Sequence, residues 1–186
     1  MQAFKSVCGR LTFLFFACLI ILTYCNREIR AQDGFINPDI DNTVIKTIVQ
    51  PDGRILAAGS FSNVAGEPRA KVVRLNPNGS LDASFQNPAV TGPAFNENVF
   101  TMALQPDGKI LIGGQFTSVG GLPRTYLARL NTDGTPDTAF APTLNNPVVT
   151  LDLETDGKIV IGGYFSVVNG QTRTNLARLN ADGSLD

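Results

Sequence analysis

Residues 99–140 read VFTMALQPDGKILIGGQFTSVGGLPRTYLARLNTDGTPDTAF, and this stretch decides the fold. Short apolar runs alternate with Asp-Gly turns, in which the glycine supplies a positive φ. An Asp-Gly pair between two apolar runs is a strong signal for a β-hairpin. The pattern therefore predicts strands over 99–104, 109–116 and 126–131, with a fourth short segment that ends at Phe140.

The same pattern occurs twice more in the chain. Residues 44–85 read VIKTIVQPDGRILAAGSFSNVAGEPRAKVVRLNPNGSLDASF, and residues 148–186 read VVTLDLETDGKIVIGGYFSVVNGQTRTNLARLNADGSLD. The difference in spacing lies wholly in the connectors, which are residues 86–98 and 141–147. A period of about 50 residues is typical of stacked repeat architectures.

The second strand of each unit indicates how the units pack. Ile110, Leu111 and Ile112 make this strand apolar on both faces, which implies sheets stacked face to face. We therefore expect an all-β, β-propeller-like array of about three four-stranded antiparallel blades. A β-solenoid is the alternative, although its rungs are shorter. A closed propeller has about four to eight blades, so the predicted ring is incomplete.

These motifs resemble a known repeat. QPDGKILIGGQF at 105–116, followed by LARLNTDG at 127–134 and a closing Phe140, is similar to the delta-60 repeat of secreted bacterial proteins. That family is also described as a domain of unknown function with a predicted β-propeller fold. The resemblance covers residues 44–186. It implies an extracellular or surface repeat protein, and it implies no known reaction.

The first 31 residues have the layout of a signal peptide. Lys5 and Arg10 are followed by an apolar run over 11–24 and by a small residue, Ala31. A run of this length is too short to span about 30 Å of hydrocarbon comfortably as a helix. We expect cleavage near Ala31 and a secreted or cell-envelope location. An uncleaved membrane anchor and lipoprotein processing at Cys25 are the alternatives.

Composition narrows the possible chemistry. The three cysteines (Cys8, Cys18 and Cys25) lie in the predicted signal peptide, so the mature chain would have no thiol nucleophile and no disulfide. The chain has no histidine, which excludes catalysis and metal binding by that residue. A net charge of −1 lacks the basic excess that nucleic-acid binding needs.

The predicted organisation has five parts. They are the signal peptide (1–31), an N-terminal remnant of a repeat with its connector (32–43), repeat 1 (44–98), repeat 2 (99–147) and a truncated repeat 3 (148–186). The remnant is inferred because Phe35 precedes its connector as Phe85 and Phe140 precede theirs. Further repeats beyond this sequence, or self-association in which two copies supply six blades, would cover the open faces.

The carboxylates and glycines of the turns recur once in each unit. Asp52, Asp107 and Asp156 offer calcium ligands, but Asp is also a good turn residue because it bonds its own backbone. We expect the turn role, since no loop has the carboxylate density of a calcium loop. Gly113-Gly114 and Gly162-Gly163 lack the helix and the lysine of a phosphate loop, and we expect a strand bulge there.

Two further sets of polar residues stand out. The recurring arginines are Arg69, Arg124, Arg173, Arg74, Arg129 and Arg178. They suggest either a grip on an anionic glycan or phosphate, or structural pairing with turn aspartates such as Asp82 and Asp137. Repetition favours pairing, because a catalytic site is normally unique. Asp152 and Glu154 occur only in repeat 3 and are interpreted as surface residues rather than a hydrolytic pair.

The predicted function is general, because no motif described above identifies a reaction or a ligand. We expect a non-enzymatic extracellular or envelope-associated repeat module that acts as a scaffold or binding surface, with no catalytic, cofactor-binding or metal residues and no cofactor. The expected partner is an unidentified protein or glycan at the propeller loops, above all at the connector 86–98. The alternative is a fragment of a larger secreted carbohydrate-active or calcium-stabilised surface protein.

Overall fold

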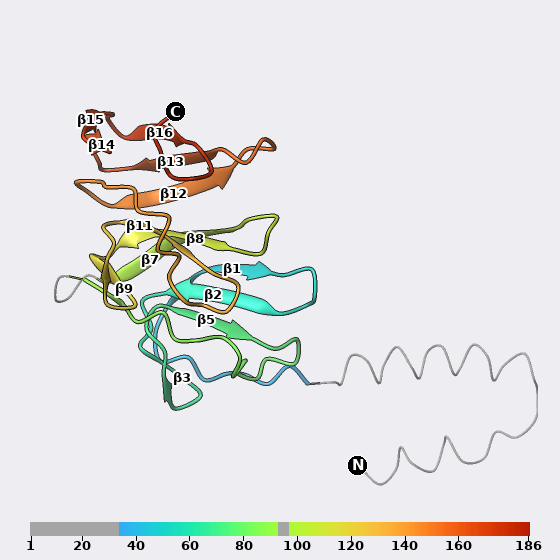
Figure 1. Ribbon diagram of the computed structural model, residues 1–186. Coiled ribbons are helices and arrows are strands. Elements are labelled where there is room, and N and C mark those ends of the chain that lie inside the picture. The colour runs from blue at the N-terminus through green and yellow to red at the C-terminus, as the bar shows by residue number, and fades with distance from the viewer. Residues whose placement is uncertain (1–33, 93–96) are drawn as a thin grey trace, which may run out of the picture. The chain divides into compact units, whose positions relative to one another are not determined.

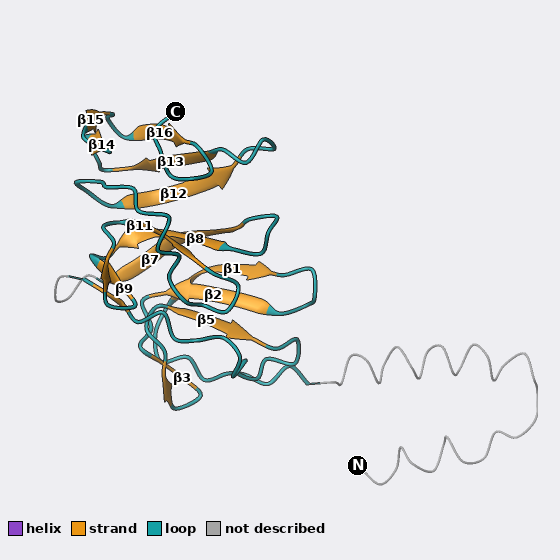
Figure 2. Cartoon of the chain, viewed as in Figure 1, coloured by secondary structure: helices purple, strands orange, loops and turns teal. Residues whose placement is uncertain are grey.

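The computed structural model describes residues 34–92 and 97–186, and residues 36–186 form one compact unit. Strands and loops make up all of this part of the chain (Figures 1 and 2). The predicted signal peptide, its cleavage at Ala31 and the lipoprotein alternative at Cys25 lie outside the described residues. No helix in the described ranges is long and apolar enough to cross a membrane.

The first repeat forms a three-stranded antiparallel sheet in the order β1-β2-β5. Its strands are β1 (Val44–Val49), β2 (Ile55–Gly59) and β5 (Val72–Leu75), with the small hairpin of β3 (Asn63–Val64) and β4 (Glu67–Pro68) inserted before β5. The register pairs Thr47 with Ala57, and Leu56 with both Ile48 and Arg74. Directly paired residues point to the same face of the sheet.

The second and third repeats have the same topology, with sheets in the orders β11-β8-β7 and β12-β13-β16. The strands of the second repeat are β7 (Asn98–Leu104), β8 (Ile110–Gln115), β9 (Ser118–Val119), β10 (Leu122–Pro123) and β11 (Leu127–Leu130). Those of the third are β12 (Val148–Leu153), β13 (Ile159–Gly163), β14 (Val167–Val168), β15 (Gln171–Thr172) and β16 (Leu176–Leu179). The connector contributes β6 (Val90–Thr91), which pairs with β9.

The predicted fourth segment is much shorter than a strand. It forms one isolated bridge in each unit, at Leu75–Leu81, Leu130–Pro136 and Leu179–Leu185. The chain turns again directly after this bridge, because Asp82 N donates to Arg74 O and Phe85 N donates to Asp82 O. The sheet proper therefore has three strands, and the fourth segment serves mainly to position an aspartate.

The three sheets stack face to face, as the two-sided strands predicted. Ile110 and Ile112 point into a core shared with repeat 1, while Leu111 points into a core shared with repeat 3. All three side chains are fully buried. The all-β, propeller-like array of antiparallel units is confirmed, and the described residues form no closed ring.

Each unit has two distinct edges in Figure 1. The Asp-Gly turns that join the first two strands of each sheet lie on one side of the stack. The hairpins β3–β4, β9–β10 and β14–β15 lie on the other side (Figure 1). We call the second side the hairpin edge. This separation places the recurring ion pairs and the loops that vary in sequence in different regions.

Candidate functional site: the ion-paired closing turns

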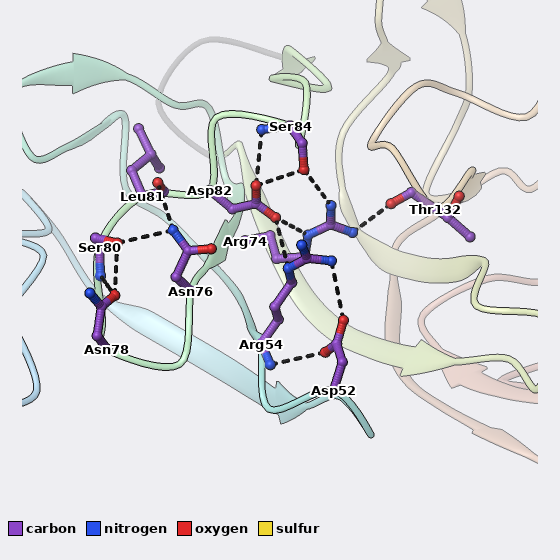
Figure 3. Close-up of polar contacts among 10 residues, drawn as sticks. All are labelled: Asp52, Arg54, Arg74, Asn76, Asn78, Ser80, Leu81, Asp82, Ser84 and Thr132. Atoms are coloured by element: carbon purple, nitrogen blue, oxygen red, sulfur yellow. Dashed lines mark hydrogen bonds and ion pairs between the residues drawn. The ribbon is translucent and has the colours of Figure 1, made fainter.

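The densest polar cluster of repeat 1 joins β5 to the turn that follows it (Figure 3). Arg74 lies on β5, and its Nε donates to Asp82 Oδ2 at 2.7 Å. Ser84 completes the cluster: its amide and its hydroxyl donate to Asp82 Oδ1 at 2.9 and 2.7 Å. Both ion-paired side chains are almost fully buried, at 8% and 6% exposed. The cluster thus ties the outer strand to the closing turn.

A second cation approaches the same carboxylate from the Asp-Gly turn. Arg54 Nε lies 3.4 Å from Asp82 Oδ2, and the corresponding Lys109 Nζ lies 2.8 Å from Asp137 Oδ2. Lys158 repeats the contact with Asp186 in the third unit, at 3.0 Å. Sequence reasoning missed these three basic residues. The signal was present, because a basic residue follows the Asp-Gly pair that joins the first two strands in each of the three units.

The electrostatics of the cluster favour an ionised carboxylate. Burial by itself would raise the pKa of Asp82, but the Ser84 hydroxyl and the Arg74 guanidinium outweigh it and lower the pKa to about 2. The pKa of Asp137 is also lowered: burial opposes the shift, and hydrogen bonds from Lys109, Ala139 and Arg129 produce it. These carboxylates are unsuited to proton transfer near neutral pH and suited to permanent ion pairing.

The same arginines reach into the next repeat. Arg74 Nη1 donates to the carbonyl of Thr132 at 2.6 Å, and Arg129 Nη1 donates to that of Ala181 at 2.6 Å. Each guanidinium also lies over the aromatic ring that closes its own unit: Arg74 is 4.8 Å from the Phe85 centroid, and Arg129 is 4.5 Å from that of Phe140. In each case one arginine side chain therefore holds the closing turn of its own unit and also hydrogen-bonds to the following unit.

The structural role predicted for the second arginine of each unit is confirmed. Arg74, Arg129 and Arg178 pair with Asp82, Asp137 and Asp186 respectively. The setting differs in the third unit, where the Arg178 side chain is 48% exposed. Arg178 also lies 3.5 Å from Glu154, a carboxylate that is present only in this unit.

The prediction of an aspartate partner is wrong for the first arginine of each unit. Arg69, Arg124 and Arg173 take part in none of the ion pairs formed within residues 34–92 and 97–186. Instead, each Nη1 donates to the carbonyl of the preceding residue at 2.8 Å. These arginines follow the β3–β4, β9–β10 and β14–β15 hairpins, and the contact that all three share is with the adjacent backbone. Arg124 also reaches its closing turn, where its Nη2 donates to the carbonyl of Thr138 at 3.2 Å rather than to an aspartate.

The recurring turn aspartates act on the backbone, as predicted. Asp52 Oδ1 accepts from the amide of Arg54 at 3.0 Å, and Asp107 accepts from Lys109 at the same distance. Asp156 does the same with Lys158 at 3.1 Å. The described part of the chain contains no group of three or more acidic, histidine or cysteine side chains that could hold a metal ion.

The paired glycines mark a bulge in the sheet, as predicted. The register shifts between Val99 and Thr101, opposite Gly113 and Gly114. A Cβ atom on Gly114 would lie 2.1 Å from the carbonyl oxygen of Asn98, so only glycine fits there. Gly163 is equally constrained by the carbonyl of Pro147, at 2.2 Å. The pair allows the first two strands to approach closely.

The acidic residues unique to repeat 3 do not act as a pair. Asp152 and Glu154 are both exposed. Asp152 Oδ1 accepts from the amide of Leu153 at 2.9 Å, whereas Glu154 pairs with Arg178. This agrees with their interpretation as surface residues.

The hairpin edge is exposed and differs between the three units. Both central residues of each hairpin have positive φ, at Ala65-Gly66, Gly120-Gly121 and Asn169-Gly170, as a two-residue hairpin with a type I′ turn requires. The residues that follow are Glu67-Pro68, Leu122-Pro123 and Gln171-Thr172, so the units present different chemistry at the same place. The connector predicted to contact partners pairs with this edge through β6, while its residues 93–96 lie outside the described part.

Comparison with known proteins agrees with this repeat architecture. A family model described as "Domain of unknown function (DUF5122) beta-propeller" matches residues 50–85, 105–140 and 154–186. The three matches each extend from the first Asp-Gly turn to the closing turn. No curated protein matches the chain.

Proposed function

Because the chain belongs to the family of DUF5122 β-propeller domains, whose function is unknown, we propose that it is a non-enzymatic binding module outside the cytoplasm, with its ligand surface at the hairpin edge. One observation carries the proposal. The second arginine and the closing aspartate of every unit are committed to ion pairs that build the fold, whereas the hairpin tips are exposed and differ from unit to unit. A repeated scaffold with variable loops is the usual design of a recognition surface.

The proposed ligand is a glycan or protein of the cell surface, which the hairpin edge would contact at several units at once. Each hairpin brings a different polar or apolar residue, such as Glu67, Leu122 and Gln171. Contacts at successive units add avidity, so weak recognition by one hairpin suffices.

A binding experiment tests this surface. The full chain is probed against a glycan array, and against intact cell envelopes with a photo-crosslinker placed at position 67 or 171. A triple variant, Glu67→Ala with Leu122→Ala and Gln171→Ala, is expected to weaken binding at least about tenfold. The matched control is Asp156→Asn at the opposite edge, where asparagine still accepts the turn hydrogen bond, and it should bind normally. Equal binding by the triple variant, or the absence of any ligand in both arms, would overturn the proposal.

The non-enzymatic part of the proposal has its own readout. A bound glycan is incubated with the protein and its chain length is measured over time. We expect the glycan to be recovered intact, and shortened products would instead favour the carbohydrate-active alternative.

The proposed location rests on the N-terminal sequence. Lys5 and Arg10, the apolar run and Ala31 follow the order of a signal peptide. N-terminal sequencing of the protein exported by a bacterial host should begin at Gln32. Retention of residues 1–31 on the exported chain, or a lipid-modified Cys25, would contradict this cleavage, and retention of the protein in the cytoplasm would contradict the location.

A further inference from the structure

The first strand of every unit carries a bulge at the same position. Pairing with the second strand skips Ile45 in β1, Phe100 in β7 and Val149 in β12, while the residues on either side do pair. This position lies at the end of the strand remote from the Asp-Gly turn, which is the side of the hairpin edge (Figure 1). Because a bulge leaves one residue unpaired and redirects its side chain, each unit presents one such side chain on this side.

All three bulged residues are apolar, and they lie outside the core. Ile45 is 43% exposed and Val149 is 40% exposed. Phe100 belongs to the middle unit, which is covered by a neighbour on both faces, and it is still only partly buried. None of the three is a member of the apolar cores that residues 34–92 and 97–186 form. Exposure at this position therefore persists where both neighbouring units are present.

Protection of the sheet edge accounts for the bulge but not for its residue type. Each of β1, β7 and β12 is at one edge of its sheet, and a bulge there discourages a further strand from pairing. A charged residue would serve this purpose better, since charge also opposes aggregation. β7 contacts both β1 and β12, so the bulged residues follow one another from unit to unit. Exposed apolar groups that gather in this way and have a polar rim mark binding sites.

A neutral polar rim accompanies these apolar residues. An asparagine precedes each bulged residue by two or three positions, at Asn42, Asn98 and Asn146. Asn42 and Asn146 are exposed, and Asn98 is partly exposed. Within the described ranges, none of the three Nδ2 groups donates a hydrogen bond, and Asn42 is held only through its Oδ1 atom, which accepts from the Thr43 amide at 2.7 Å. These amide groups can therefore donate to a ligand.

The charges of the three first strands cancel. β1 contributes Lys46, β12 contributes Asp152 and β7 contributes no charged residue. A surface without net charge gives an anionic or cationic polymer no electrostatic advantage. Apolar side chains combined with free amide donors suit a ligand that has apolar faces and many hydroxyl oxygens. A neutral saccharide has this chemistry, because the CH groups of a sugar ring pack on apolar side chains and its hydroxyls accept hydrogen bonds.

We propose that Ile45, Phe100 and Val149, here called the bulge strip, bind a neutral glycan. A sugar ring packs its apolar face on Phe100, and a hydroxyl oxygen of the same glycan accepts from Asn98 Nδ2. Ile45 and Val149 make the corresponding contacts with other rings of the glycan, so that several weak contacts add avidity. This inference rests on the function proposed above and narrows it: it names the ligand class, and it extends the binding surface from the hairpin tips to the first strands.

Calorimetric titration of the full chain with a panel of neutral hexasaccharides of glucose, mannose, galactose and N-acetylglucosamine tests the bulge strip. At least one of them is expected to bind, and polygalacturonate, an anionic polysaccharide, is not. Phe100→Ser removes the ring and should weaken binding at least about tenfold, whereas Phe100→Tyr keeps the ring and should bind like the parent chain. Ile45→Ser combined with Val149→Ser changes the two residues that are already exposed, and should weaken binding by a similar factor.

Val49→Ser is the matched control, because Val49 is an apolar residue of β1 that is 70% exposed but lies next to the Asp-Gly turn and pairs normally. It should bind like the parent chain. Equal melting temperatures show that the variants fold, and if Phe100→Ser does not fold, the double variant decides.

Three results would overturn the bulge strip. They are unchanged binding by Phe100→Ser and the double variant, binding of polygalacturonate alone, and no binding of the parent chain to any of the neutral hexasaccharides. In each case, crosslinking from position 67 or 171 to an envelope protein would still support the function proposed above, so the two proposals fail separately.

Discussion

Repeats 2 and 3 carry almost the same residues in different surroundings. Leu127 and Leu176 both begin the LARL strand, yet one is fully buried and the other is 65% exposed. Arg129 and Arg178 make the same ion pair, yet their side chains are 11% and 48% exposed. A covering neighbour, rather than the residue itself, sets what each position contributes to stability. Substitutions at matched positions can measure that contribution directly.

The largest difference is expected for the two leucines. Leu127→Ala leaves a cavity in the core between repeats 2 and 3 and should lower the free energy of unfolding by about 3–5 kcal/mol. Leu176→Ala removes a side chain that is mostly in water, and should cost less than about 0.5 kcal/mol. Denaturant unfolding, at a concentration below any self-association, gives both values. Equal costs would show that repeat 3 is already covered in solution.

The next largest difference in stability is expected between the closing ion pairs of repeats 1 and 3. Asp82→Ala strands the buried guanidinium of Arg74 without its main partner, and should cost about 3 kcal/mol. Asp186→Ala breaks the same pair at a site open to solvent, where water and salt screen the attraction, and should cost much less. Thermal unfolding of the two variants side by side measures the difference. A large loss for Asp186→Ala would mean that the exposed pair is held as rigidly as the buried one.

Acid should weaken the buried pair at a predictable pH. The folded-state pKa of Asp82 is about 2, below its ordinary value of 3.8. A lowered folded pKa stabilises the protein above pH 4, and this contribution of about 2 kcal/mol disappears as the pH falls from 4 to 2. Asp82→Asn should therefore be less stable than the parent chain at pH 6 and approach it near pH 2. A constant gap between the two unfolding curves at every pH would contradict the ion-pair account.

Much of this fold could be predicted from local sequence. Asp107-Gly108 predicts a turn because glycine adopts positive φ and aspartate bonds the amide two residues on, and the structure shows both. Ile110 to Ile112 predicts a strand covered on two sides, because an apolar side chain on each face needs a neighbour on each face. Such features depend on a few adjacent residues, so the sequence alone reveals them.

Features that depend on distant backbone were not predictable in the same way. A carbonyl acceptor has no side-chain signature, so the contact from Arg74 to Thr132, far along the chain, leaves no trace in the sequence. Tyr126 has a φ of 68°, and its counterparts Lys71 and Asn175 share this left-handed conformation. Lysine and tyrosine would not be chosen for that region on propensity alone, since it suits glycine best and asparagine next. The fixed path between hairpin and outer strand imposes it.

The smallest expected difference in stability between repeats 2 and 3 concerns a single hydroxyl group, that of Thr101 in one repeat and Thr150 in the other. Thr101 Oγ1 accepts a hydrogen bond from Leu151 N inside the junction of repeats 2 and 3, and Thr101 is only 6% exposed. Thr101→Val keeps the shape but leaves that amide without its partner, which should cost about 1 kcal/mol. Thr150→Val makes the same change on the face of repeat 3 that points away from repeat 2, where water replaces the lost acceptor, and should leave the stability of the isolated chain unchanged. Hydrogen exchange at Leu151 should accelerate in the first variant only. Unchanged exchange there would show that the Thr101 hydroxyl contributes nothing to this junction.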